Sequence, residues 1–381
     1  MHEQTTRQAA LQQLERTESY LAADPANARL LAAAVDHALA AGLAQRAAEH
    51  AEAAVARYPD DDVLAARLGN VLLAQGRHDQ AGALFDALLE RHADPALAYG
   101  AAYACYCQGL PAQALARLQP YADGAALAPQ SVLLLVRVLH LNGDPERALA
   151  VALAQRARCG DDPSLLAAAS LAALDDNQLE QAQALANAAL DGPQRPPEAL
   201  VSAGSLALAR MEPDVAAALL GEVVAARPEE GRAWSALGMA SLLRRDLDAA
   251  RSQLETAVRL MPGHIGSWHS LGWCCLFAGD RLAARAAFEH ALGLDRNFGE
   301  SHGALAVLLA QGGEREEAAR TIERALGLDP QSLAARYAQM VLGGQTEDPE
   351  RFRQLARRLM QSRQGAFGHT LSDLMDAYQA R

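Results

Sequence analysis

The sequence of 381 residues contains no lysine, and aromatic residues make up only 4% of it. Hydrophobic residues account for 51%, so the chain is too apolar to remain disordered. The scarcity of aromatic and β-branched residues argues against a β-sandwich, whose strands favour both types. The abundant alanine and leucine favour helices, because alanine loses no side-chain entropy in a helix. We therefore expect an all-α protein.

The basic side chains are all arginine, and the formal net charge is -12. An acidic chain repels phosphate backbones, so we do not expect a nucleic-acid partner. We interpret the use of arginine in place of lysine as the mark of a GC-rich bacterial genome rather than of a selected arginine function.

No apolar stretch approaches the roughly 20 residues that cross a bilayer. The first 20 residues are polar and lack the apolar segment of a secretory signal. The sequence therefore predicts a cytoplasmic protein without membrane insertion.

The five cysteines are Cys105, Cys107, Cys159, Cys274 and Cys275. None of them forms a CxxC pair, the spacing typical of zinc ligands. We expect reduced thiols, no metal site and no cofactor. The sequence also has no HExxH, GxSxG or P-loop motif, so we expect no enzymatic activity.

One alanine recurs through almost the whole chain at a spacing of 34 residues, except for one step of 33. Its nine positions are Ala47, Ala81, Ala114, Ala148, Ala182, Ala216, Ala250, Ala284 and Ala318. A fixed period of this length is the sequence signature of a repeat architecture.

Glycine and proline follow the same period. A glycine stands five residues before the alanine at Gly42, Gly76, Gly109, Gly143, Gly279 and Gly313. Glycine ends a helix readily because it adopts the left-handed conformation without penalty. A proline stands twelve residues after the alanine at Pro59, Pro228, Pro262 and Pro330, where it stops a second helix.

A second glycine position lies inside the first helix of three units, at Gly69, Gly238 and Gly272. Glycine within a helix costs about 1 kcal/mol relative to alanine, so the position needs a reason. We expect the backbones of two helices to approach closely there, with no side chain between them.

The unit that best keeps the whole pattern contains Trp234, Leu237, Gly238, Ala250, Ala257 and Pro262. The next unit repeats it with Trp268, Leu271, Gly272, Ala284, Phe288 and Ala291. This arrangement of helix, glycine turn, helix and proline turn resembles the tetratricopeptide repeat family. Nine full units begin near residues 28, 62, 95, 129, 163, 197, 231, 265 and 299.

The resemblance divides the chain into three parts. Residues 1–27 are expected to form an N-terminal capping helix, and residues 28–332 the nine repeats. Residues 333–381 are expected to hold a partial repeat and capping helices at about 349–362 and 370–379. Such caps cover the apolar faces of the end units, which have no neighbour.

The family resemblance implies a right-handed superhelix whose concave groove is lined mainly by the first helix of each unit. The groove positions hold two clusters that are rich in aromatic residues. The candidate binding residues are Tyr99, Tyr103, Tyr106, Arg137, His140, Met239, His269, Trp273 and Phe277. Tyrosine and tryptophan often dominate binding hot spots. The alternatives are that these side chains pack between helices, or that a terminal segment of the chain occupies the groove.

These features predict a non-catalytic scaffold or adaptor that binds a peptide or helix of a client protein. An alternative is an accessory subunit of a bacterial glycosyl- or sulfo-transferase, polysaccharide or secretion system. Another is a self-associating structural protein, such as a homodimer, that uses its caps or its basic C-terminal tail. Because the chain lacks lysine, we do not expect the carboxylate clamp that some family members use.

Overall fold

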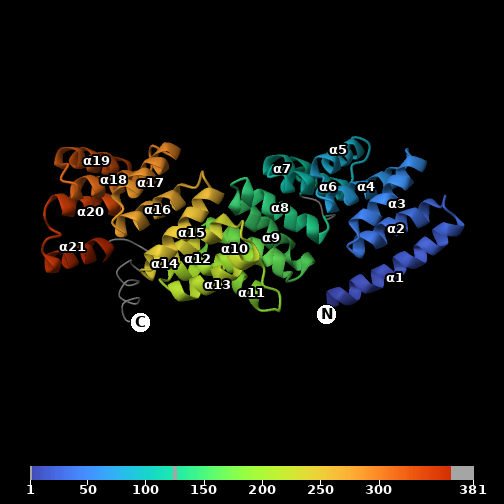
Figure 1. The fold of residues 1–381 in the computed structure, drawn as a ribbon, viewed down its shortest axis with the longest axis horizontal. Helices are drawn as coiled ribbons and strands as arrows, with labels where there is room; N and C mark the ends of the chain where they lie inside the picture. The colour runs from blue at the N-terminus through green and yellow to red at the C-terminus, as the bar shows by residue number, and fades with distance from the viewer. Residues whose placement is uncertain (1, 123–126, 362–381) are drawn as a thin grey trace. The chain divides into compact units, whose positions relative to one another are not determined.

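The computed structural model describes residues 2–122 and 127–361. These residues form 21 α-helices and one short 3₁₀ helix, and no strand occurs among them (Figure 1). In chain order the elements are α1 His2–Ala23, α2 Ala28–Ala40, α3 Ala44–Arg57, α4 Asp62–Ala74, α5 His78–Leu89, α6 Pro95–Cys107, α7 Pro111–Leu118, η1 Gln119–Tyr121, α8 Pro129–Leu141, α9 Pro145–Cys159, α10 Pro163–Asp175, α11 Leu179–Leu190, α12 Pro197–Ala209, α13 Pro213–Ala226, α14 Gly231–Leu243, α15 Leu247–Leu260, α16 Ile265–Phe277, α17 Arg281–Leu294, α18 Gly299–Gln311, α19 Arg315–Leu328, α20 Leu333–Leu342 and α21 Pro349–Gln361.

The chain forms two compact units, residues 1–172 and 173–381, which divide within α10. In unit 1, each α-helix from α1 to α8 contacts the next α-helix in the chain. In unit 2, the same holds for each helix from α11 to α19. The predicted all-α class and the sequential stacking of helical hairpins are confirmed.

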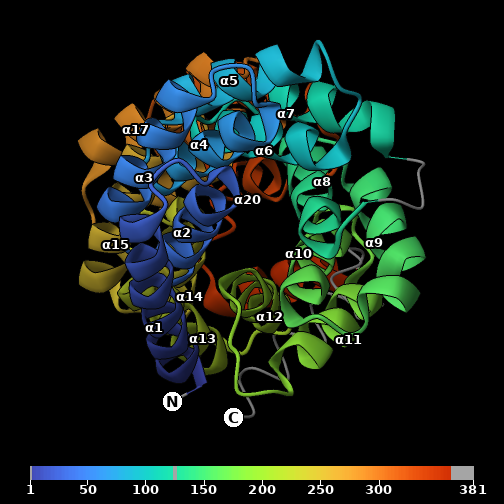
Figure 2. The same cartoon turned by 90° about the vertical axis from the view of Figure 1, so that its right-hand side faces the viewer.

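Within each unit, the first helices of successive hairpins also contact one another. These contacts join α2 to α4, α4 to α6 and α6 to α8 in unit 1, and α12 to α14 and α14 to α16 in unit 2. Among the described residues, second helices of successive hairpins make no contact of comparable extent. First helices are therefore the closer-packed layer, and each unit is concave on that side, as unit 1 shows in Figure 2.

The periodic alanine explains why the hairpins close. All nine of these alanines, on the second helices, have no exposed surface. A methyl group lets the neighbouring helices approach, and a larger side chain would separate them. Acidic and amide residues before the first helices act as N-caps. For example, Asn27 accepts hydrogen bonds from two backbone N–H groups of α2, and Asp61 does the same for α4.

The turn inside each hairpin requires one residue in the left-handed conformation. The six periodic glycines occupy this position with φ between 70° and 82°. Three consecutive hairpins place a non-glycine residue there: Asn177, Met211 and Arg245, with φ of 58°, 57° and 62°. The hydrogen bonding is the same, because the residue after Arg245 donates its N–H to the carbonyl of Ser241 at 3.0 Å. The backbone geometry of the hairpin therefore persists where glycine is missing, at a cost in strain.

Replacing Arg245 with glycine should relieve that strain. We expect Arg245→Gly to raise the free energy of unfolding by about 0.5–1 kcal/mol, after the entropy that glycine adds to the unfolded chain is subtracted. The matched control is Arg244→Gly, because Arg244 has φ -76° and gains nothing from glycine. Urea denaturation should show opposite shifts of the midpoint for the two variants, and equal shifts would contradict the strain argument.

The glycine inside the first helix has a different role from the one expected. A side chain of the second helix fills the space next to it, so the two backbones are not in direct contact. A Cβ atom at Gly272 would lie 2.4 Å from a ring carbon of Phe288, and one at Gly238 would lie 2.5 Å from Cγ of Leu254. In unit 1 the ring of Phe85 lies against Gly69 of α4 and also against Gly100 of α6.

Adding a methyl group at this position should destabilise the hairpin. Phe288 is fully buried and has no room to retreat, so Gly272→Ala should lower the free energy of unfolding by about 1–3 kcal/mol. Gly221 lies within α13, and a Cβ atom added there would have no neighbouring atom within 4 Å. Gly221→Ala is the control and should be stabilising by up to about 1 kcal/mol, because alanine is the better helix former. Unchanged stability of Gly272→Ala in chemical denaturation would refute the role assigned to Phe288.

The two tryptophans of the repeat pattern, Trp234 and Trp268, each join a hairpin to the turn before it. The indole Nε1 of Trp234 donates to the carbonyl of Pro228, and that of Trp268 to the carbonyl of Pro262, both at 2.8 Å. The next two repeats form the same bond with other donors. His302 donates to the carbonyl of Arg296, and Arg336 donates to the carbonyl of Pro330. This position therefore requires a long side chain with an N–H donor, and residues other than tryptophan can provide it.

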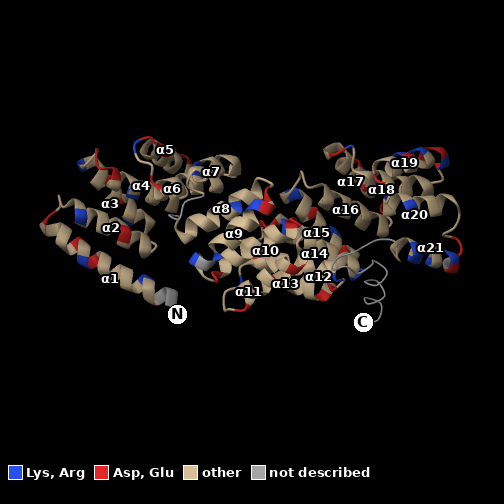
Figure 3. Ribbon diagram, turned by 180° about the vertical axis from the view of Figure 1, so that it is seen from behind, with Lys and Arg blue, Asp and Glu red and all other residues tan. Residues whose placement is uncertain are grey.

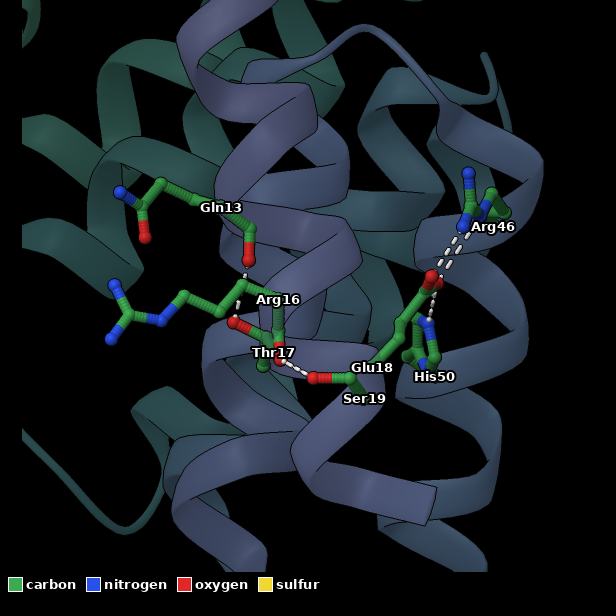
Figure 4. Close-up of polar contacts among 7 residues, drawn as sticks. All are labelled: Gln13, Arg16, Thr17, Glu18, Ser19, Arg46 and His50. Atoms are coloured by element: carbon green, nitrogen blue, oxygen red, sulfur yellow. Dashed lines mark hydrogen bonds and ion pairs between the residues drawn. The ribbon is translucent and has the colours of Figure 1, made fainter.

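Helix α1 covers the start of the first repeat. Its Glu18 accepts hydrogen bonds from Arg46 and His50 of α3, as Figure 4 shows. Partial burial opposes ionisation, but the hydrogen bonds from His50 and Arg46 hold the pKa of Glu18 below its ordinary value. On the same helix Arg7 donates from Nε to the carbonyl of Ala41 at 2.7 Å.

At the other end, α20 begins at Leu333 and α21 spans Pro349–Gln361. Glu300 of α18 accepts the backbone N–H of Leu333 at 2.9 Å, which ties α20 to the preceding hairpin. Helix α21 has arginines at 351, 353, 357 and 358, and Figure 3 colours the charged residues along its ribbon. The helix predicted at 370–379 lies outside the described residues. Among the described helices, none is both long and apolar enough to cross a membrane.

Candidate protein-binding surface

Three tyrosines form a stack along α6, which we call the tyrosine ladder: Tyr99, Tyr103 and Tyr106. The ring centroids of Tyr99 and Tyr103 are 5.8 Å apart, and those of Tyr103 and Tyr106 are 6.3 Å apart. The ring planes differ by 21° and 28°, so neighbouring rings are nearly parallel. All three side chains are half-buried. The structure thus brings together the three residues that the sequence singled out on this helix.

Small residues on the remaining faces of α6 explain the orientation of the ladder. Ala98, Ala101, Ala102 and Ala104 are fully buried, and Cys105 is nearly so. Helix α6 packs into the unit through these small side chains. The large aromatic side chains at i, i+4 and i+7 therefore share the less buried face.

The next first helix, α8, adds the two predicted basic residues. Arg137 and His140 are both half-buried, and α6 contacts α8 directly. Burial raises the pKa of Tyr99, and the positive charge of Arg137 acts in the opposite direction.

In unit 2, the predicted aromatic residues separate into a packed part and an exposed part. His269 is mostly enclosed, and its ring lies 5.6 Å from that of Phe288 and 5.7 Å from that of Phe298. The indole Nε1 of Trp273 donates to Nε2 of His269 at 2.9 Å, so the proton of the neutral imidazole is on Nδ1, which is 3.3 Å from Oγ of Ser301. These two side chains pack between hairpins, which is the alternative that the sequence left open.

The other two residues of this cluster face solvent. Phe277 has 63% of its surface exposed and lies with its ring 5.6 Å from that of Trp273. Met239 on α14 is 38% exposed. Phe277 and Met239 are thus the members of the second cluster that a partner can reach.

The candidate binding residues were chosen mainly for their aromatic side chains, and this choice missed some exposed apolar side chains. Val63 on α4 and Leu141 on α8 are both more than half exposed. Both lie on first helices, which the family resemblance places along the groove, so a search of these helices for apolar residues of every type would have found them. Leu282, 85% exposed on α17, lies on a second helix, which such a search would not include. Among the described residues, no group of three or more His, Cys, Asp or Glu side chains could hold a metal ion.

The packed histidine predicts a pH effect on stability. Burial lowers the pKa of His269 below its ordinary value of 6.5, against a smaller opposing effect of Glu300. The unfolded chain therefore binds a proton at this residue more readily than the native chain, and stability falls as the pH drops through about 6.5.

The variant His269→Gln removes that proton-binding site and keeps an acceptor for Trp273. We expect the loss of stability between about pH 7.5 and about pH 5.5 to be smaller in His269→Gln than in the native protein. Urea denaturation at both pH values measures the difference. Equal losses in the two proteins would show that His269 is protonated as easily in the native state as in the unfolded chain.

Four matches to family models cover more than half of the chain, and each describes a tetratricopeptide repeat. They span residues 38–104, 201–265, 265–298 and 301–349. No curated protein sequence matches the chain at a significant level. None of the matching family models describes an enzyme.

Among solved structures, a monomeric mutant of IFIT1 with Gppp-AAAA is 13% identical, with a TM-score of 0.54 over 93% of this chain and 89% of that chain. PilF of Pseudomonas aeruginosa is 18% identical over 55% of this chain and 96% of that chain, with a TM-score of 0.46. MamA from Desulfovibrio magneticus RS-1 is 23% identical over 44% and 95% of the two chains, with a TM-score of 0.36. The likeness to IFIT1 supports the fold, and proteins built from such repeats typically mediate protein–protein interactions. From its family matches and its stacked hairpins, this chain belongs to the tetratricopeptide repeat family.

Proposed function

We propose that the protein is a non-catalytic scaffold that binds a segment of a client protein on the concave side of its first helices. The observation that supports this most is the placement of its few aromatic residues. In a chain with 4% aromatic residues, the half-buried tyrosine ladder and the exposed Phe277 all lie on first helices.

Accessible aromatic side chains on a rigid helix suit binding. They cover a large area with few rotatable bonds, so ordering them on binding costs little entropy. The tyrosine ladder is also ordered in advance, because its three rings stack on one another. The two accessible patches lie in different units, so each can be tested separately.

Removing Phe277 should weaken client binding without harm to the fold. Phe277→Ala should reduce the amount of partner that co-purifies from an extract of the source cells, because a hot-spot aromatic typically contributes about 2 kcal/mol or more. The change in thermal stability should be small, within about 0.5–1 kcal/mol, because the side chain is largely exposed.

The control is Leu282→Ala, which removes a more exposed apolar side chain from the second helix of the same hairpin. It should leave partner recovery unchanged. In unit 1, Tyr103→Ala should also reduce recovery, with a stability loss of about 1 kcal/mol from two lost ring contacts. If Phe277→Ala and Tyr103→Ala both retain full recovery while Leu282→Ala reduces it, the binding face is the other side of the hairpins.

A further inference from the structure

We propose that the cleft between α17 and α19 binds a small zwitterion with apolar side chains, of the class of apolar dipeptides. Its carboxylate would lie at Arg320 and Arg324, and its ammonium group at Glu317. The cleft lies between second helices, so this inference is independent of the surface on first helices to which the proposed function refers.

The packing of three helices in unit 2 creates the cleft. Helix α18 contacts both α17 and α19, but among the described residues α17 and α19 make no contact of comparable extent with each other. The two second helices therefore form the walls, and α18 forms the floor, of a cavity of about 350 Å³. Pockets for small molecules have volumes of about 300–1,000 Å³, so this cavity suits a dipeptide better than a large cofactor.

The floor of the cavity is apolar. Leu305 and Leu309 of α18 line it, together with Leu292 from the wall formed by α17. Leu309 is buried, and the other two leucines are half-buried. An apolar ligand side chain that covers these leucines removes their remaining surface from water, which favours binding.

Two arginines line the α19 side of the cavity. Arg320 and Arg324 are exposed and lie one helical turn apart. Neither guanidinium forms an ion pair or a hydrogen bond with any described residue. Like charges at this spacing repel each other. A carboxylate between the two groups removes the repulsion and accepts charge-assisted hydrogen bonds from both.

An ion pair between α17 and α19 fixes which residues face each other across the cleft. Successive hairpins repeat the same path, so the two second helices run in the same direction. Arg285, in the second turn of α17, lies 3.6 Å from Glu314, the residue before α19. Counted from this contact, Glu289 is four residues along α17 and Glu317 is three residues along α19. Both carboxylates therefore line the cavity near the start of α19, and the arginine pair lies further along that helix.

The cavity thus has an acidic end and a basic end. At the acidic end, Glu289 lies 3.9 Å from Arg285, which partly compensates its charge. The Glu317 carboxylate has no ion pair with a described residue. Three to seven residues separate Glu317 from the arginine pair, which is about 5–10 Å along the helix axis. A dipeptide separates its charged ends by up to about 7 Å, so it can reach both ends of the cavity.

A ligand with a single charge suits this cavity less well. Phosphate or another simple anion gains the arginine contacts but comes close to the unpaired carboxylate of Glu317. A cation meets the opposite difficulty at the arginine pair. A zwitterion satisfies the unpaired groups at both ends, and the apolar floor selects zwitterions with apolar side chains over polar ones.

Isothermal titration calorimetry on the full-length protein tests this inference, with leucyl-phenylalanine as the probe. The native protein should bind this dipeptide. The N-acetylated form lacks the ammonium group and the C-terminal amide lacks the carboxylate, so each should bind at least about tenfold more weakly. Seryl-serine keeps both charges without the apolar side chains and should also bind more weakly than leucyl-phenylalanine.

Two variants that each remove one charge locate the site. Glu317→Gln and Arg324→Gln should each reduce the affinity for leucyl-phenylalanine at least about fivefold, because each removes the partner of one charged end. Glu317→Gln should not reduce the affinity for the N-acetylated form, which has no ammonium group. Both side chains are exposed, so the melting temperature should stay unchanged.

Each variant has a matched control outside the cavity. Glu316→Gln removes the same charge from the neighbouring residue in the first turn of α19, and Glu316 does not line the cavity. Arg259→Gln removes an exposed arginine from the last turn of α15, the preceding second helix. Both controls should leave the affinity for leucyl-phenylalanine unchanged.

The inference is wrong if leucyl-phenylalanine does not bind at millimolar concentration. Equally tight binding of the N-acetylated form would overturn it as well, because the cavity would then be a simple anion site. So would an affinity that is insensitive to Glu317→Gln and Arg324→Gln, or one that the two controls lower as much. These results leave the proposed function intact, because partner recovery in Phe277→Ala and Tyr103→Ala tests that function on the first helices.

Discussion

In the hairpins that begin with α4, α14 and α16, one large side chain of the second helix fits against a glycine of the first helix. Phe85, Leu254 and Phe288 fill this position, and the glycine opposite provides a surface without a side chain. The periodic alanine four residues earlier keeps the same two helices close. A single hairpin cannot bury its remaining apolar face. Successive hairpins therefore stack on one another within each compact unit.

The fold followed from the sequence because its rules are local and recur at a fixed period. The nine first helices begin at the residues where the 34-residue spacing places them, from Ala28 to Gly299. The packing at Gly238 and Gly272 could not be derived in this way. The sequence shows that a small residue is needed there, but only the coordinates show whether backbone or side chain fills the space.

The candidate surface was predictable to a lesser degree, because exposure depends on neighbours that are distant in the sequence. Tyr103 and Trp273 occupy the same position of their repeats, yet Tyr103 stacks within a ladder while Trp273 bonds to His269 and packs on Phe288. The difference arises from Phe288 and Phe298, aromatic residues of neighbouring elements that crowd the second site. The repeat position therefore gives the direction of a side chain, and its neighbours decide whether it is accessible.

The three turns without glycine affect where unfolding of the repeat array begins. An array in which elements contact only their chain neighbours opens first at its least stable link, whether or not that link is at an end. The hairpins with Asn177, Met211 and Arg245 at the left-handed position are three in a row, and the division between the two compact units falls in the first of them. Loss of structure would begin in this interior stretch, and the capped termini would outlast the middle.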